Sequence, residues 1–153
     1  VGTPIERENA LTEVEEYLAK REKQEKQEET AHRARILVVD DSMTIRHSMK
    51  QLLDKDYEVA VAESGVAAIR TITLNPPDLV LLDYEMPVVD GKQTLEMLRS
   101  DKAFSNIPVI FLTASGYEDD VRSAIRLGAV NYLKKPFFPK ELLKRVAKEL
   151  DKE

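Results

Sequence analysis

The chain contains no cysteine among its 153 residues. It can therefore form no disulfide, zinc–thiolate site or thiol nucleophile. It also lacks an apolar stretch long enough to span a bilayer, and an N-terminal apolar segment of the signal-peptide type. Basic residues are outnumbered, and a formal net charge of -5 argues against nucleic acid or an anionic membrane as a direct partner. These features predict a cytoplasmic protein that binds neither nucleic acid nor an anionic membrane directly.

Composition changes abruptly near Arg35. Hydrophobic residues make up 42% of the chain and charged residues 33%, an ordinary balance for a globular protein. A chain of 153 residues has room for one compact domain with a core and a short appendage. We therefore expect a charged helical linker or extension over residues 1–34, most strongly helical over 8–29, and one folded domain over residues 35–153.

The N-terminal segment has an apolar stripe that ends early. Leu11, Val14 and Leu18 lie at heptad spacing, but Arg21 and Glu25 occupy the next two positions of that stripe. About two helical turns are too few to identify a coiled coil. One interpretation is a solvated connecting helix. The other is a helix that pairs with another copy in a homodimer, or continues into an upstream domain.

Short apolar runs alternate with helical periodicity in the second part of the chain. The runs at 36–39, 79–82 and 109–112 are apolar on both faces, which is typical of central strands in a parallel sheet covered by helices. Residues 57–62 predict a more exposed strand. Residues 129–133 predict a short fifth strand.

Apolar positions with helical spacing lie between these runs. They are Ile45, Met49, Leu52 and Leu53 after the cap Ser42; Val121, Ala124 and Ile125 before the helix stop at Gly128; and Leu142, Leu143, Val146, Ala147 and Leu150 after Pro139. Five consecutive β–α units predict an α/β fold with a doubly wound open sheet and right-handed crossovers. A closed eight-fold barrel would need a longer chain.

Polar side chains follow the apolar runs at the carboxyl ends of the strands, where open α/β sheets bind ligands. They are Asp40 and Asp41 after the first run, Asp83 after the third, Thr113 after the fourth, and Lys135 with Pro136 after the fifth. Three carboxylates at one edge repel each other, and Mg²⁺, which prefers carboxylate oxygens, relieves that repulsion. A lysine and a hydroxyl suit phosphoryl oxygens. An aspartate not fully used by the metal can act as a nucleophile and form an acyl phosphate.

Each of these residues also has an ordinary structural interpretation. Asp41 or Ser42 can cap the helix that follows. Asp83 can be a loop carboxylate, and the Thr113 hydroxyl can bond to local backbone. Lys135 can be a surface lysine in a turn. These separate roles do not explain why four strand ends carry compatible chemistry.

The motifs resemble the receiver domain of two-component response regulators, of the chemotaxis-regulator type. The similarity covers the chain from about Arg35 to its end and lies in LVVDDS (37–42), LLDYEMPVVDG (81–91), IFLTAS (110–115) and NYLKKPF (131–137). It implies a flavodoxin-like sheet of five strands in the order 2-1-3-4-5 with five helices, preceded by the N-terminal helical extension.

The resemblance also implies roles for the acidic residues. Asp83 would be the phosphoacceptor and would contact Mg²⁺. Asp41 would bind the ion directly, and Asp40 would do so partly through water. The backbone carbonyl of Glu85 would complete the ligands from the protein.

Further roles follow from the same resemblance. Lys135 would contact the phosphoryl group, and its peptide bond to Pro136 would be cis. Thr113 would move toward the phosphoryl group on activation. Tyr132 would be the switch aromatic whose ring turns inward, although an aromatic on a short strand is also an ordinary core residue. His47, expected on the outer surface of a helix, is not predicted to donate phosphoryl groups, and neither is His32 in the linker.

The implied function is a phosphorylation-activated switch rather than an enzyme acting on other substrates. Its partners would be a histidine kinase or phosphotransfer protein and an output of unknown identity. Three rival classes fit less well. An aspartyl phosphatase needs a second Asp where Glu85 stands, a flavin or nucleotide module would place phosphate against Asp40 and Asp41, and a receiver-like domain that is not phosphorylated would have lost an acidic residue or the lysine.

Overall fold

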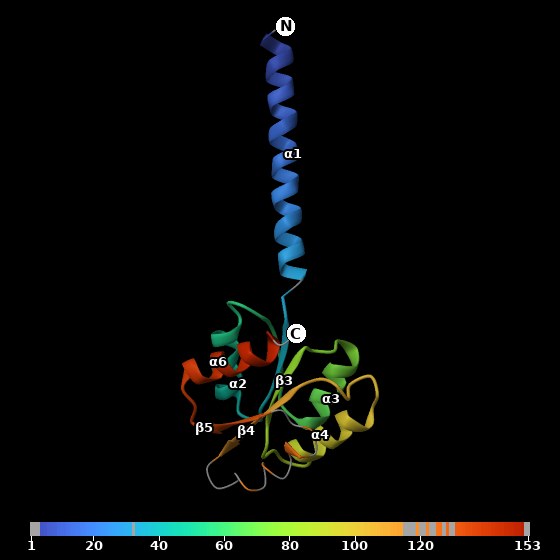
Figure 1. The fold of residues 1–153 in the computed structure, drawn as a ribbon, viewed down its shortest axis with the longest axis vertical. Helices are drawn as coiled ribbons and strands as arrows, with labels where there is room; N and C mark the ends of the chain where they lie inside the picture. Colours follow the sequence, from blue (N-terminus) through green and yellow to red (C-terminus); the bar gives the residue numbers. More distant parts are fainter. Residues whose placement is uncertain are drawn as a thin grey trace. The chain divides into compact units, whose positions relative to one another are not determined.

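The computed structural model describes residues 4–31, 33–114 and 131–151, together with positions 119, 122, 125, 126 and 128. By its internal contacts the chain divides into two compact units, Val1–Arg33 and Ala34–Glu153. The first unit is a helix, and the second contains a parallel β-sheet (Figure 1).

The N-terminal unit consists of helix α1, Pro4–Ala31. Proline is favourable at the start of a helix, and neither proline nor glycine occurs again before the helix ends. The expected charged helix is therefore present and extends beyond residues 8–29. None of the helices in the described parts of the chain combines the length and apolar character needed to cross a membrane.

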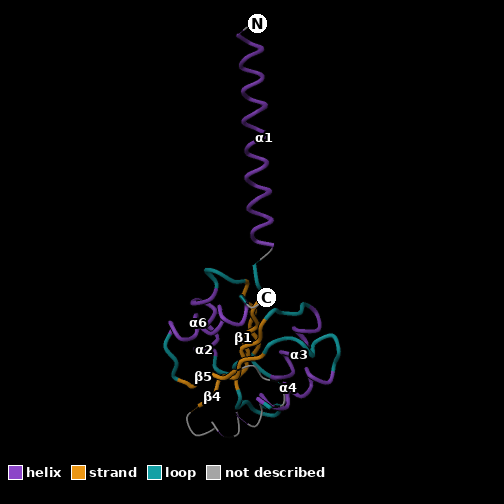
Figure 2. Tube along the Cα trace, viewed as in Figure 1, coloured by secondary structure: helices purple, strands orange, loops and turns teal. Residues whose placement is uncertain are grey.

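The second unit is built on five parallel strands. They are β1 (Arg35–Val39), β2 (Glu58–Ala62), β3 (Leu79–Asp83), β4 (Val109–Ala114) and β5 (Asn131–Lys135). Their order in the sheet is β2-β1-β3-β4-β5, and every neighbouring pair is parallel. Figure 2 shows the strands in orange between helices. The predicted flavodoxin-like α/β sheet is confirmed.

Four described helices flank this sheet. They are α2 (Met43–Leu53), α3 (Gly65–Leu74), α4 (Gly91–Ser100) and α6 (Pro139–Leu150). In Figure 1, α2 and α6 lie on one face and α3 and α4 on the other. Ser42 caps α2 as predicted. The expected helix through Val121, Ala124 and Ile125 falls outside the described residues except at Ile125.

Alternation along the strands divides the core into two layers. On the α3–α4 face, Leu37, Val80 and Phe111 pack with the helices, and all are fully buried. On the α2–α6 face, the neighbouring positions Val38 and Leu81 do the same. Burying a side chain of this size contributes about 1.5–3 kcal/mol, so both faces of the central strands stabilise the sheet. This explains why their sequences are continuously apolar.

The strands extend further toward their carboxyl ends than the apolar runs. Asp83 is the last residue of β3, Thr113 lies within β4, and Lys135 ends β5. The prediction that these residues follow their strands was wrong by one or two positions, because backbone pairing continues after the apolar side chains stop. Residues 129–130 of the predicted fifth strand lie outside the described residues. The second strand begins at Glu58, one residue later than predicted.

Candidate functional site

Three carboxylates meet at the carboxyl edge of the sheet. Asp40, Asp41 and Asp83 each place one carboxylate oxygen within 4.8 Å of the others. Asp40 and Asp83 are 1% and 5% exposed, whereas Asp41 is exposed. The cluster combines residues 42 positions apart, because β1 and β3 are neighbours and end at the same level.

Several hydrogen bonds hold Asp40 in place. Its backbone N–H donates to Ala62 (3.2 Å), and its Oδ1 accepts from the Ser42 N–H (2.9 Å). The Arg46 Nη1 donates to its backbone carbonyl (2.7 Å). The backbone of Asp40 is thus held by the sheet and by α2, and its carboxylate by the N–H of the cap residue Ser42.

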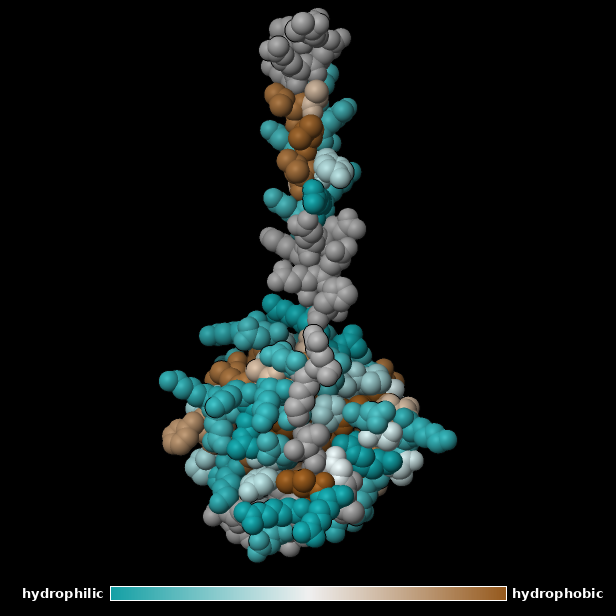
Figure 3. All heavy atoms as spheres, in the orientation of Figure 1, coloured by the Kyte–Doolittle hydropathy of each residue, from teal (hydrophilic) through white to brown (hydrophobic). Residues whose placement is uncertain are grey.

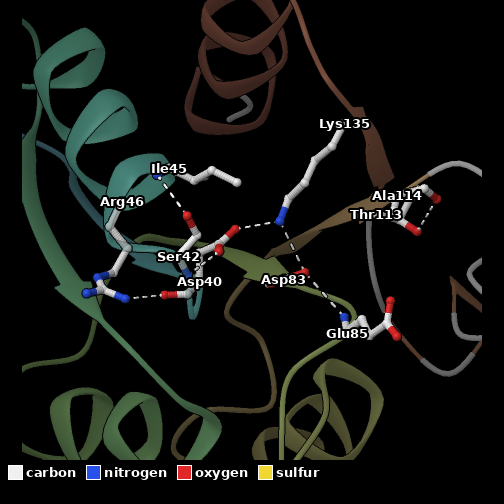
Figure 4. A network of polar contacts seen from close by, with 9 residues as sticks. All are labelled: Asp40, Ser42, Ile45, Arg46, Asp83, Glu85, Thr113, Ala114 and Lys135. Atoms are coloured by element: carbon white, nitrogen blue, oxygen red, sulfur yellow. Dashed lines mark hydrogen bonds and ion pairs between the residues drawn. The ribbon is translucent and has the colours of Figure 1, made fainter.

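Lys135 provides the positive charge that buried carboxylates need. Its Nζ lies 2.6 Å from Asp40 Oδ2 and 3.3 Å from Asp83 Oδ1. Figure 4 shows the lysine reaching from its strand to a point between the two carboxylates. The peptide bond between Lys135 and Pro136 is cis. A buried charge is tolerated when it is paired, so this lysine is part of the cluster's electrostatic balance.

The Asp83 carboxyl is strongly perturbed. Burial raises its pKa from the ordinary 3.8 to about 7. The nearby charge of Lys135 lowers this pKa and that of Asp40 raises it. A hydrogen bond from the Glu85 N–H lowers it again, and one involving Asp41 raises it. Desolvation, the largest cause, disfavours the charged carboxylate of Asp83. An additional cation at this position would stabilise that carboxylate and lower its pKa.

The loop from β3 to α4, which follows Asp83 in the chain, carries a strained residue. Val88 has a φ of 69° and its side chain is 96% exposed. A β-branched residue in the left-handed region costs about 1–2 kcal/mol, and so exposed a side chain recovers little of this by packing.

We therefore expect Val88→Asn to raise the free energy of unfolding by about 1 kcal/mol, because asparagine tolerates the left-handed region. Urea unfolding followed by circular dichroism measures it. The control is Val61→Asn on the edge strand β2, also an exposed valine, where the same change should lower stability. Equal effects at both positions would contradict strain at Val88.

Thr113 and Tyr132 make contacts outside the charge network of Lys135. The Thr113 side chain is buried, and its Oγ1 donates to the carbonyl of Ala114 (3.2 Å). Figure 4 shows this pair separated from the network around Lys135. Tyr132 is half-buried and packs against the core layer on the α3–α4 face. The predicted switch roles of Thr113 and Tyr132 stay predictions.

Two contributors to the site were missed from the sequence. Arg46 was not singled out from the sequence, yet its side chain donates to the Asp40 carbonyl. Gly91 appeared only as the last residue of the motif at 81–91, yet a Cβ there would lie 2.5 Å from the Asp83 carbonyl oxygen. A basic residue one helical turn after the Ser42 cap was the available signal for the first. Gly91 had no such signal, because a glycine that lets two backbone segments approach closely cannot be told from any other loop glycine in the sequence. His47 is exposed on α2 as expected, and His32 lies outside the described residues.

The donor set suits a hard divalent cation. All three convergent side chains offer carboxylate oxygens, and no softer ligand is among them. Asp41 is the most accessible of the three, so a hydrated ion would approach from its side. The Glu85 backbone carries its N–H toward Asp83 (3.3 Å), next to the expected carbonyl ligand. The residues present therefore fit the metal that the sequence predicts.

Comparison with known proteins identifies the family. The family model described as "Response regulator receiver domain" matches residues 36–147. Chemotaxis protein CheY1 of Helicobacter pylori is 38% identical over 115 residues, covering 73% of this chain and 93% of that protein. The phosphate regulon regulator PhoB of Pseudomonas aeruginosa is 38% identical over 112 residues, covering 72% and 49%.

Solved structures agree with these matches. A putative response regulator from Chloroflexus aurantiacus has a TM-score of 0.74 and 33% identity, covering 78% of this chain and 99% of its own. Vibrio cholerae CheY4 has a TM-score of 0.73 and 31% identity, covering 77% and 99%. The chain spans about half the length, or less, of several curated relatives that it matches. Together with the strand order and the clustered acidic residues, these matches show that the chain belongs to the family of response regulator receiver domains of two-component systems.

Proposed function

We propose that residues 35–153 form a phosphorylation-activated switch that accepts a phosphoryl group on Asp83 from a phosphohistidine donor, and that residues 1–34 are an extension. The observation that carries the proposal is the position of Asp83. Its buried carboxylate lies 3.3 Å from Lys135 Nζ and shares a cluster with two further carboxylates. One phosphoryl group could therefore contact the nucleophile Asp83, the ammonium group of Lys135 and a metal ion held by the carboxylates.

The transfer step uses Asp83 as the nucleophile. A carboxylate oxygen forms a bond to phosphorus as the phosphorus–nitrogen bond of the donor breaks, and the electron pair of that bond returns to the imidazole. Lys135 stays beside the new phosphoryl oxygens and balances part of their charge. The only group modified is a side chain of this chain, so the domain promotes its own phosphorylation and dephosphorylation and no other reaction.

The acidic residues would hold Mg²⁺, with Asp41 and Asp83 as direct ligands, Asp40 partly through water, and the backbone carbonyl of Glu85 completing the set. The ion would supply charge neutralisation for the phosphoryl oxygens. Arg46 and Ser42 keep Asp40 oriented through the hydrogen bonds described above. These residues thus prepare the site before any phosphoryl group arrives.

The switch would involve Thr113 and Tyr132. Among the described residues, the Thr113 hydroxyl donates to the Ala114 carbonyl (3.2 Å), and it can exchange this bond for one to a phosphoryl oxygen. Movement of Thr113 would let the half-buried Tyr132 ring turn inward. β5 and α6 would transmit the change to an output domain or protein.

A labelling experiment tests this function. Purified chain is incubated with a small phosphodonor, such as acetyl phosphate, and its intact mass is followed. We expect saturation at one phosphoryl group per chain, a requirement for Mg²⁺, and loss of labelling with EDTA. Asp83 must be deprotonated to react, and bound Mg²⁺ lowers its pKa from the metal-free value of about 7, so the rate should fall more steeply below pH 7 at low Mg²⁺ than at saturating Mg²⁺. Labelling that is independent of Mg²⁺, or that exceeds one group per chain, would refute the proposal.

Replacing Lys135 by methionine should change the pH dependence of metal binding. The lysine lowers the pKa of Asp83, so its loss leaves the carboxyl protonated to higher pH. We expect the affinity for Mg²⁺, measured by calorimetry, to fall by up to about tenfold at pH 7. At pH 9 it should be no lower than that of wild type, because the loss of a nearby positive charge is then the remaining effect. The exposed neighbour offers a control, Lys134→Met, which should change neither value. A loss of affinity that persists at pH 9 would contradict this role of Lys135.

A further inference from the structure

Helix α1 carries an exposed apolar stripe. Leu11, Val14 and Leu18 are 63%, 54% and 48% exposed, and the adjacent Tyr17 is 65% exposed. Figure 3 shows brown, hydrophobic atoms gathered along one side of the described part of this helix, among hydrophilic neighbours. Isolated charged helices are only marginally stable in water, so such a stripe is stabilising when another surface covers it.

The spacing of the stripe selects the kind of surface. Leu11, Val14 and Leu18 occupy consecutive a, d and a positions of a heptad, which pack against a helix with the same spacing. Such a pattern is present on every copy of this chain. Glu15 and Glu22 at the flanking e positions keep the apolar face narrow, which fits a pair of helices better than a larger bundle.

The charged residues beside the stripe favour one relative orientation of the two helices. In a parallel pair, each e position faces a g position of the partner helix, so Glu15 faces Ala10 and Glu22 faces Tyr17. In an antiparallel pair, e positions face each other, and the glutamates would repel across the seam. The parallel arrangement avoids this repulsion.

The length of the stripe limits the strength of pairing. Arg21 and Glu25 take the next seam positions, so the apolar contact ends after Leu18. Four side chains per helix bury less than the roughly 1,200–2,000 Å² of a standard stable interface. The pairing should therefore be weak and concentration-dependent.

From these observations we infer that α1 pairs in parallel with α1 of a second copy through Leu11, Val14 and Leu18, with Tyr17 at the rim. The pair tethers two receiver domains and raises the effective concentration of each domain near the other. It depends on no residue of the acidic cluster, so it stands apart from phosphorylation.

Sedimentation equilibrium of the full chain tests the pairing. We expect a monomer–dimer equilibrium, weakened at least about tenfold by Leu18→Glu, because each dimer would bury two glutamates at the seam. The control Asn9→Glu adds the same charge on the opposite face of α1 and should leave the association unchanged. The association should also persist in Asp83→Asn, which separates it from the proposed phosphoryl acceptance. A chain that stays monomeric up to about millimolar concentration, forms a larger oligomer, or responds equally to both glutamates would overturn the inference.

Cysteine cross-linking tests the orientation, because the chain has no cysteine of its own. In a parallel pair Leu11→Cys lies opposite itself and should form a disulfide dimer under mild oxidation. Glu16→Cys, at an f position on the far face, should cross-link at least about tenfold more slowly. Equal cross-linking of the two variants, or none at position 11 in a chain that associates, would exclude the parallel pair.

Discussion

Replacing Asp83 by asparagine is expected to abolish phosphoryl acceptance and, at the same time, to stabilise the folded domain above pH 7. The amide lacks the carboxylate nucleophile, so labelling should fall by at least about 100-fold. The gain in stability follows from burial. Asp83 is 5% exposed, and desolvation is the largest cause of its raised pKa.

The pH range of this gain follows from the pKa of the two states. In the folded chain Asp83 holds its proton up to about pH 7, whereas in the unfolded chain it releases it near its ordinary pKa of 3.8. The folded state therefore binds more protons between these values, and stability falls as pH rises from about 4 to 7. Asparagine removes this dependence. We expect the variant to be more stable than wild type by roughly 2 kcal/mol at pH 8, and similar to it at pH 4.

Urea unfolding at pH 4, 6 and 8, without divalent cations, measures the difference. Asp56→Asn is the matched control, because Asp56 is exposed and the change in net charge is the same. It should leave the pH dependence unaltered. Adding Mg²⁺ should recover stability in wild type but not in Asp83→Asn. Undiminished labelling of Asp83→Asn would refute its role as acceptor, and a variant less stable than wild type at pH 8 would refute the electrostatic argument.

The sequence was sufficient to predict which residues converge. Short runs that are apolar on both faces identify buried parallel strands, and parallel strands bring their carboxyl ends to one edge. Asp40 and Asp83 lie close together for this reason alone, although the sequence around each residue gives no sign of their contact. The same logic brought Lys135 to the cluster from the far end of the chain. The strand order itself came from the family resemblance rather than from periodicity.

The geometry inside the site could not be predicted in this way. Whether the Thr113 hydroxyl turns to the cluster or to the Ala114 carbonyl depends on a side-chain rotation that the residue type leaves open. The positive φ of Val88 is equally invisible, because valine is among the residues least expected there. Close approaches are hardest to foresee, since a glycine that permits contact and a glycine that merely permits a turn look alike.

Gly91→Ala tests the closest of these approaches. A Cβ at this position would lie 2.5 Å from the Asp83 carbonyl oxygen and 2.7 Å from the Tyr84 Cα. Both are backbone atoms, so the obstruction cannot be relieved by turning a side chain. Alanine normally stabilises a helix relative to glycine by about 1 kcal/mol, but here we expect a net loss of about 2–3 kcal/mol.

The same backbone displacement should also slow phosphoryl transfer to Asp83. Moving the Asp83–Tyr84 backbone separates the Asp83 carboxylate from Lys135 Nζ, now 3.3 Å away. We expect at least about a tenfold slower phosphoryl labelling, measured where circular dichroism shows the variant to be fully folded.

Gly65→Ala is the matched control, because a Cβ there would meet side-chain atoms of Thr94 and Val89 instead of backbone. Its loss of stability should be reduced in the double variant with Thr94→Ala, which removes the obstructing hydroxyl. Gly91→Ala has no such partner to remove. Labelling at the wild-type rate in a folded Gly91→Ala chain would show that the backbone at Asp83 can shift without cost, and that Gly91 serves only the start of α4.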